Sequence, residues 1–139
     1  MLQALASGDY QAGAARFIDY WNAPGSFAAL SAKRQAGLAA RMPRVALDFW
    51  ALLVEQATLA EFRAALTMPV LILEGDRSPT PSRWICRMLE SALPSAWLVT
   101  LPGAGHMAPL TDPDTVNLVV ASFLADFAHF GRPSLRASA

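Results

Sequence analysis

The chain has 139 residues, of which 54% are hydrophobic and 16% are charged, and its 11 basic and 11 acidic side chains give a net charge of zero. Because neither a basic nor an acidic run is present, nucleic acid and anionic membrane surfaces are poor candidates as partners. The single cysteine, Cys86, excludes an internal disulfide framework, and no apolar run is long enough to span a membrane. No signal peptide is recognised, and a small cytoplasmic protein is expected.

Residues 1–67 are predicted to form a helical segment, because apolar side chains recur at helical spacing between turn signals. Asp9 is expected to cap a first helix and Ser26 a second. Pro43 is expected at the start of a third helix, where its missing N–H is tolerated, and Thr58 is expected to cap the continuation of that helix.

Residues 68–131 show a different pattern, in which short apolar runs alternate with helical stretches. Residues 70–73 and 96–101 predict two buried strands, and residues 79–92 and 112–127 predict the helices that follow them. Strands joined through a helix in this way form a parallel pair with a right-handed crossover. The chain is therefore predicted to be an α/β protein, with the helical segment followed by a β-α-β-α unit.

Two parallel strands leave two unpaired edges, whereas parallel sheets are normally larger and covered by helices on both faces. The unit is therefore expected to be the end of a larger sheet. An open edge also allows pairing with a second copy, so a homo-oligomer is an alternative expectation. Residues 132–139 are expected to form a flexible tail.

The loop that follows the second predicted strand carries the clearest chemical signal. Residues 101–107, Leu-Pro-Gly-Ala-Gly-His-Met, place His106 just beyond the carboxyl end of that strand, where catalytic groups of open α/β sheets collect. Gly103 and Gly105 are expected to adopt positive φ angles and to bring the imidazole over the sheet edge. An imidazole transfers protons near neutral pH, although a lone loop histidine with only a local hydrogen bond is the simpler reading.

Several segments together resemble the C-terminal part of the α/β-hydrolase fold. These are residues 68–76, the stretch 93–96 before the second strand, the histidine loop 102–106 and the Leu-Thr-Asp-Pro of residues 110–113. Residues 9–66 are similar to the helical cap that such enzymes insert before their last two strands. The resemblance implies a partial α/β-hydrolase fold, with residues 1–67 as a cap-like segment.

The resemblance also implies roles for individual residues. His106 matches the catalytic base, which takes a proton from a nucleophile and passes it to a leaving group. The usual position of the catalytic acid is occupied by Ser78, which carries no charge. Asp76 is the nearest candidate for the acid, although a solvated turn residue paired with Arg77 is the preferred reading of this position.

The substrate side of the site is predicted from apolar residues. Phe49 and Trp50 of the cap-like segment and Met107 beside the base are the candidates for substrate binding. No G-x-S-x-G nucleophile turn occurs in the sequence. We therefore expect the C-terminal portion of a hydrolase for an ester-like or other small apolar substrate, inactive until an N-terminal half supplies the nucleophile.

Two other classes of function are considered. A non-catalytic remnant, or an interaction module that associates through its open sheet edge, is the alternative to a hydrolase. A nucleotide-binding Rossmann domain is disfavoured, because Gly103-Ala104-Gly105 is followed by His106 and not by the glycine pattern of that fold. No metal ion or cofactor is expected.

Overall fold

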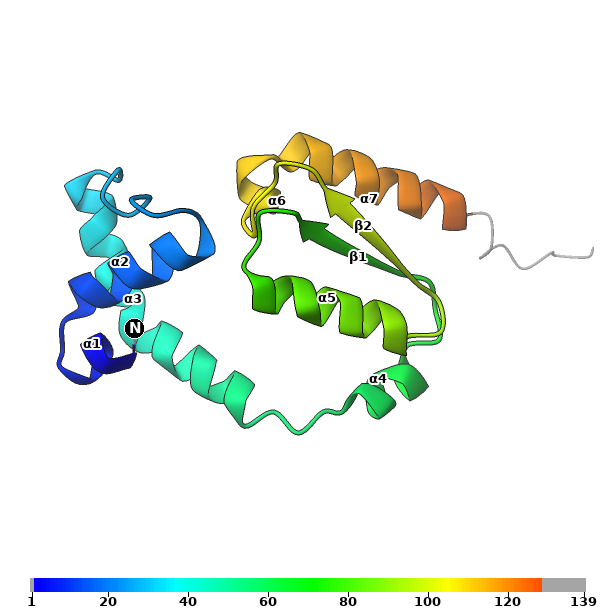
Figure 1. The fold of residues 1–139 in the computed structure, drawn as a ribbon, viewed down its shortest axis with the longest axis horizontal. Coiled ribbons are helices and arrows are strands. Elements are labelled where there is room, and N and C mark those ends of the chain that lie inside the picture. Colours follow the sequence, from blue (N-terminus) through cyan, green and yellow to red (C-terminus); the bar gives the residue numbers. More distant parts are fainter. Residues whose placement is uncertain (1, 129–139) are drawn as a thin grey trace, which may run out of the picture.

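The computed structural model describes residues 2–128 (Figure 1). Its elements in chain order are α1 (Leu2–Ala6), α2 (Tyr10–Trp21), α3 (Ala32–Leu53), α4 (Leu59–Ala65), β1 (Val70–Gly75), α5 (Thr80–Ala92), β2 (Ala96–Leu101), α6 (Ala108–Thr111) and α7 (Pro113–Ala128). The chain is a mixed α/β protein with a two-stranded parallel sheet. The expected tail at residues 132–139 lies outside the described part of the chain.

Strands β1 and β2 pair in parallel, with Val70 opposite Ala96 and Gly75 opposite Leu101. Helices α5 and α7 lie on opposite sides of the two strands (Figure 1). On the α7 side, a small core forms around Leu101, Ala104 and Ala108, which pack against half-buried valines of β2 and α7. The predicted β-α-β-α order is therefore confirmed, and the short helix α6 is an addition to it.

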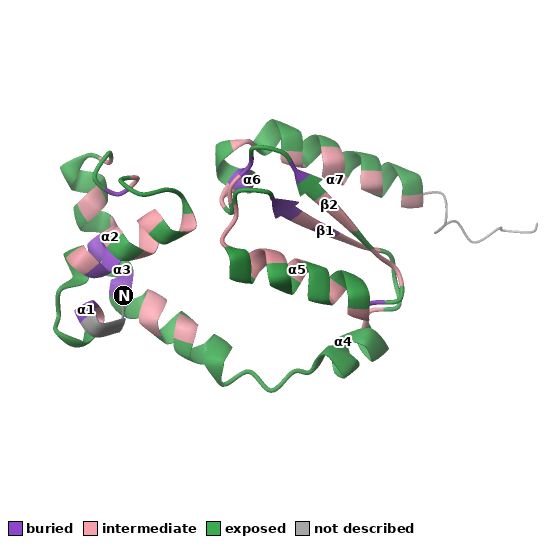
Figure 2. Cartoon of the chain, viewed as in Figure 1, coloured by how far each residue is buried: buried purple, intermediate pink, exposed green. Residues whose placement is uncertain are grey.

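The strands are less buried than their apolar sequences predict. Trp97 of β2 is 45% exposed, and Leu71, Leu73 and Val99 are only half-buried. The expectation of fully buried strands is wrong for the described residues, because the single helix on each face leaves several strand side chains partly exposed. Buried residues instead gather at the carboxyl ends of the strands and inside the helical segment (Figure 2).

Helices α1, α2 and α3 form a second core of their own. Ala14, Phe27, Ala39 and Met42 are buried at its centre. Phe27 belongs to the connection between α2 and α3, and its backbone N–H donates a hydrogen bond of 2.8 Å to the Asp19 carboxylate. That hydrogen bond holds the connection against α2. The buried residues together give the first half of the chain a core that is separate from the sheet.

The helix starts predicted from capping residues are confirmed at two positions. The Asp9 carboxylate accepts the Ala12 N–H at 2.9 Å and caps α2. Thr58 caps α4 through a reciprocal capping box, in which its hydroxyl accepts the Glu61 N–H and the Glu61 carboxylate accepts the Thr58 N–H at 2.7 Å.

Two other helix predictions are wrong. Ser26 lies in a series of turns, and Ser31 caps α3 instead. Pro43 lies inside the 22-residue helix α3 and not at a helix start. A proline removes one backbone hydrogen bond from a helix interior. The helix continues through it because Ala39 and Met42, on the preceding turn, are anchored in the core.

Within residues 2–128, no helix combines the length and the apolar character needed to cross a bilayer.

Candidate functional site

The two loops that follow β1 and β2 are tied together at the carboxyl edge of the sheet. The N–H of Asp76 donates to the Leu101 carbonyl at 3.2 Å, and the N–H of Arg77 donates to the Ala104 carbonyl at 3.0 Å. The backbone of Gly75 passes so close to Ala104 that a Cβ atom there would overlap the Ala104 carbonyl group. The glycine therefore permits the close approach that fixes the loop carrying His106.

The two glycines of the histidine loop adopt different conformations. Gly103 has a φ of +73°, as predicted. Gly105 does not have a positive φ, so that part of the prediction is wrong. The Gly105 carbonyl accepts the Ala108 N–H at 3.1 Å and so begins the turn into α6, which requires an ordinary backbone conformation.

His106 lies where the helical segment meets the sheet edge. Its imidazole ring contacts the indole ring of Trp21, at the end of α2, with ring centroids 4.4 Å apart and planes inclined by 34°. The histidine side chain is otherwise exposed. A residue of the helical segment thus covers one side of the predicted base.

A cavity of about 290 Å³ opens beside His106. Polar groups on its wall come from the end of β1, from the loop after it and from the start of α5, namely Glu74, Ser78, Ser82 and Arg83. Apolar side chains from both sides of the sheet complete the wall, among them Leu73, Ile85, Leu101 and Val116. Because it draws on both faces, the cavity lies across the carboxyl end of β1.

The structure places Ser78, and not Asp76, in this cavity with His106. The Asp76 side chain is exposed. Among the residues described, no hydrogen bond or ion pair joins the Asp76 carboxylate to His106 or to Arg77. The role of Asp76 as the catalytic acid therefore stays a prediction.

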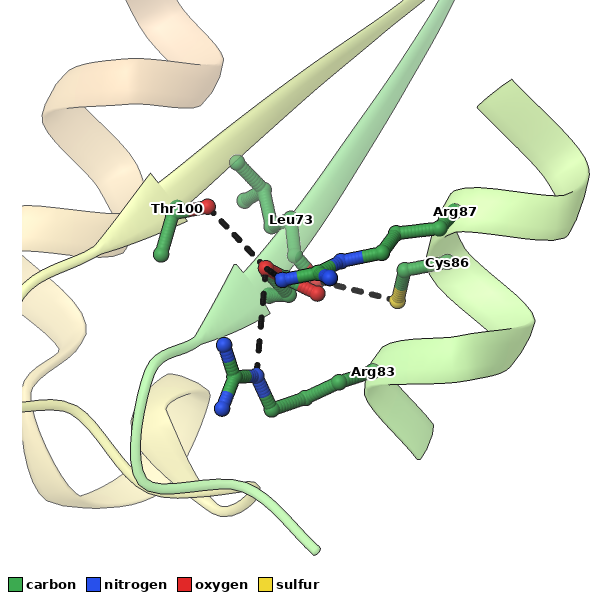
Figure 3. Close-up of polar contacts among 6 residues, drawn as sticks. Leu73, Arg83, Cys86, Arg87 and Thr100 are labelled. Carbon is green, nitrogen blue, oxygen red and sulfur yellow. Dashed lines mark hydrogen bonds and ion pairs between the residues drawn. The ribbon is translucent and has the colours of Figure 1, made fainter. Parts of the chain in front are cut away.

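Glu74 brings a buried carboxylate to the end of β1, and the labelled side chains of Thr100, Arg83 and Arg87 come from β2 and α5 (Figure 3). Its side chain is 2% exposed, and its Oε1 atom accepts the Thr100 hydroxyl at 3.1 Å from the position opposite it on β2. The guanidinium groups of Arg83 and Arg87 approach the same oxygen at 4.0 and 3.8 Å. The Oε2 atom of Glu74 and the Nε atom of Arg83 are buried without a hydrogen-bond partner.

Cys86 lies on α5 beside this carboxylate and lines the same cavity. Burial raises the pKa of its thiol, and the negative charge of Glu74 raises it further. The thiol is therefore kept neutral, which disfavours the nucleophilic thiolate form.

A second cavity, of about 420 Å³, has mainly aromatic walls. It lies where α2, α3 and the start of α5 meet, and its lining residues are Arg16, Phe17, Tyr20, Trp21, Phe49 and Pro81. Phe49 packs edge-on against Phe17, with ring centroids 6.1 Å apart. Phe49, a predicted substrate-binding residue, is thus part of a pocket whose wall includes the tryptophan that covers His106.

The other two predicted substrate-binding residues lie elsewhere. Trp50 is 65% exposed and does not line this pocket. Met107 follows His106 and is half-buried, and its carbonyl accepts the Leu110 N–H at 2.8 Å. Met107 lines neither of the two cavities.

Sequence reasoning gave no specific role to Trp21 and overlooked Glu74. The sequence does contain a signal for Glu74, because this charged residue directly follows the apolar run of residues 70–73. Trp21 had none, because its contact with His106 joins residues 85 positions apart in the chain.

Within residues 2–128, no group of three or more His, Cys, Asp and Glu side chains is arranged to hold a metal ion.

The chain is distantly similar to proteins that are named as hydrolases. The chain is 29% identical over 72 residues to the "Putative carbamate hydrolase RutD" of Klebsiella pneumoniae subsp. pneumoniae strain MGH 78578. It is 31% identical over 72 residues to the proteins of the same name from Klebsiella pneumoniae strain 342 and Klebsiella variicola strain At-22. Each match covers 52% of this chain and 27% of the relative, so the matched segment spans about a quarter of the relatives' length. No family model and no solved structure matches the chain.

Proposed function

We propose that the chain is the C-terminal portion of an α/β hydrolase and supplies its general base, His106, and its helical cap. The observation that carries the proposal is the contact between His106, at the carboxyl end of β2, and Trp21 of the helical segment. A base at a strand end with an aromatic ring against one side suits the proton transfers of acyl transfer. The similarity to hydrolases over half of the chain supports the same conclusion.

The proposed chemistry needs a nucleophile from residues outside these 139. A serine hydroxyl oxygen bonds to the substrate carbonyl carbon while His106 takes the hydroxyl proton. His106 then returns the proton to the leaving group as the acyl bond breaks, and water hydrolyses the acyl intermediate by the same proton route. The substrate is a small apolar ester or, by likeness to the relatives' name, a carbamate.

Reconstitution tests this proposal. The 139-residue chain is co-expressed with the portion of a Klebsiella relative that precedes the matched segment, chosen to carry a nucleophile turn, and hydrolysis of p-nitrophenyl esters and carbamates is measured. We expect turnover that falls by about a thousandfold or more in His106→Ala, because the nucleophile then lacks its base. His129→Ala, which removes the other histidine of the chain, is the matched control. A purified complex without turnover, or one equally active with His106→Ala, would contradict the proposal.

A second candidate function, self-association without catalysis, is favoured by exposed apolar side chains around the sheet. Trp84, Ile85 and Met88 of α5 are 66%, 52% and 48% exposed, and within the described residues β1 pairs with β2 alone, which leaves its other edge open. A second copy of the chain is the occupant this alternative requires.

Light scattering of the purified chain tests the alternative. Trp84→Glu is expected to dissociate such a dimer, whereas Trp50→Glu, at an equally exposed tryptophan of the helical segment, is expected to leave it intact. A monomer at all concentrations would exclude the alternative.

A further inference from the structure

We infer that the aromatic cavity between α2, α3 and α5 binds a flat apolar group that carries a negative charge, such as an aryl carboxylate. The inference deepens the proposed function, on which it rests, because it names the substrate class. The pocket volume of about 420 Å³ falls in the range of small-molecule sites.

The pocket presents aromatic rings from two helices. Phe17, Tyr20 and Trp21 occupy positions i, i+3 and i+4 of α2 and therefore share one face of that helix. Phe49 faces them from α3, and ring contacts link Phe17 both to Trp21 at 6.3 Å and to Phe49 at 6.1 Å. Aromatic walls favour a flat apolar guest, which stacks against their faces or edges.

The charge of the pocket lining determines which flat ligands the pocket favours. Arg16 is the one charged residue that lines the pocket, and within residues 2–128 no ion pair to its guanidinium is found. Asp19 of the same helix does not line the pocket, and its carboxylate accepts the Phe27 N–H. Asp9 borders a separate hollow that Arg16 also lines, and its carboxylate accepts the Ala12 N–H. Aromatic cages also attract organic cations, but a guanidinium on the pocket wall opposes a cation and favours an anion.

The pocket is adjacent to the predicted base. Trp21 belongs to the pocket wall and also contacts the His106 imidazole at 4.4 Å. The pocket and the predicted base therefore share Trp21 as a neighbour, which places a ligand in the pocket close to His106.

Calorimetric titration of the 139-residue chain with three naphthalene derivatives tests the inference. 2-Naphthoate is expected to bind about two- to fivefold more tightly than 2-naphthylmethanol, since one exposed ion pair contributes this much. The cation 2-naphthylmethylammonium is expected to bind most weakly.

Substitutions in the pocket test whether the three ligands bind there. Arg16→Gln is expected to abolish the preference for the anion and to leave binding of the alcohol unchanged. Phe49→Ala is expected to weaken all three ligands by about fivefold, and Phe49→Leu, which retains bulk, is the second variant should the alanine variant unfold. Arg34→Gln is the matched control, because Arg34 belongs to a separate basic hollow with Lys33 and Arg41.

The outcomes separate this inference from the proposed function. No binding, a preference for the cation, or an anion preference lost in Arg34→Gln and retained in Arg16→Gln would overturn the inference. Ester hydrolysis that depends on His106 could still be observed with each of these results, so they would leave the proposed function standing.

Discussion

Trp21 and His106 are 85 positions apart in the chain, yet their rings lie 4.4 Å apart. Trp21 ends α2 in the helical segment, and His106 lies in the loop after β2. The pair joins two parts of the molecule whose cores are otherwise separate. It also gives the predicted base an aromatic cover and a neighbouring apolar pocket, which are the features on which the proposed function depends.

Glu74 is expected to stabilise the junction of β1, β2 and α5. Glu74→Ala leaves Thr100 without its hydrogen-bond acceptor and the partly buried Arg83 without a nearby counter-charge, and about 1–3 kcal/mol of unfolding free energy should be lost. Urea denaturation measures the change. Glu90→Ala, at an exposed glutamate of α5, is the control and should stay within about 0.5 kcal/mol of the native chain. Equal effects of the two substitutions would contradict a role for the Glu74 cluster.

Alanine substitutions at two glycines distinguish the effect of close backbone approach on stability from the effect of helix propensity. Gly75→Ala would force its Cβ against the Ala104 carbonyl group, so it should destabilise the protein and disturb the His106 loop. Gly37→Ala lies in α3 with open space around the new Cβ, and it should stabilise the protein by about 0.5–1 kcal/mol. Thermal melts of both variants provide the measurement. A stabilising Gly75→Ala would refute the tight contact between the two loops.

The capping box of α4 gives a pH-dependent prediction. Hydrogen bonds from the backbone and hydroxyl of Thr58 lower the pKa of Glu61. Because the folded-state pKa is the lower one, the stabilisation is present at neutral pH and is lost as the pH falls through that depressed value. Hydrogen exchange at the start of α4, corrected for intrinsic rates, should therefore show weaker protection in acid. Glu61→Gln, which removes the titrating carboxyl, should remove this pH dependence, and an unchanged profile in that variant would contradict the assignment.

The sheet was predictable because its signals are local. Short apolar runs bounded by Pro69 and by turn residues indicated both strands, and the capping side chains of Asp9 and Thr58 indicated two helix starts. Ser26 and Pro43 misled the prediction of α3, because residues that favour a helix start by themselves were overridden by packing. The buried Met42 holds α3 together next to Pro43, and this depends on a core that no local pattern reveals.

The candidate site was predictable only in part. His106 was found from its loop, whereas the relation of Trp21 to it depends on how α2 folds back toward the sheet. Phe49 was selected as an apolar residue of the helical segment and does line a pocket, while its neighbour Trp50 is turned to solvent. Successive helical residues point in directions about 100° apart, so only the packing of α3 decides which of the two faces the pocket.

The proposed function depends most on the helical segment covering His106, and proton NMR of the imidazole tests this directly. In the native chain, nuclear Overhauser effects should connect the His106 ring protons to the Trp21 indole. Ring-current shielding should also move the imidazole resonances upfield. Trp21→Ala should abolish both effects, whereas Trp50→Ala, at an exposed tryptophan of α3, should change neither. Imidazole resonances at random-coil positions in the native chain, unchanged by Trp21→Ala, would contradict the account.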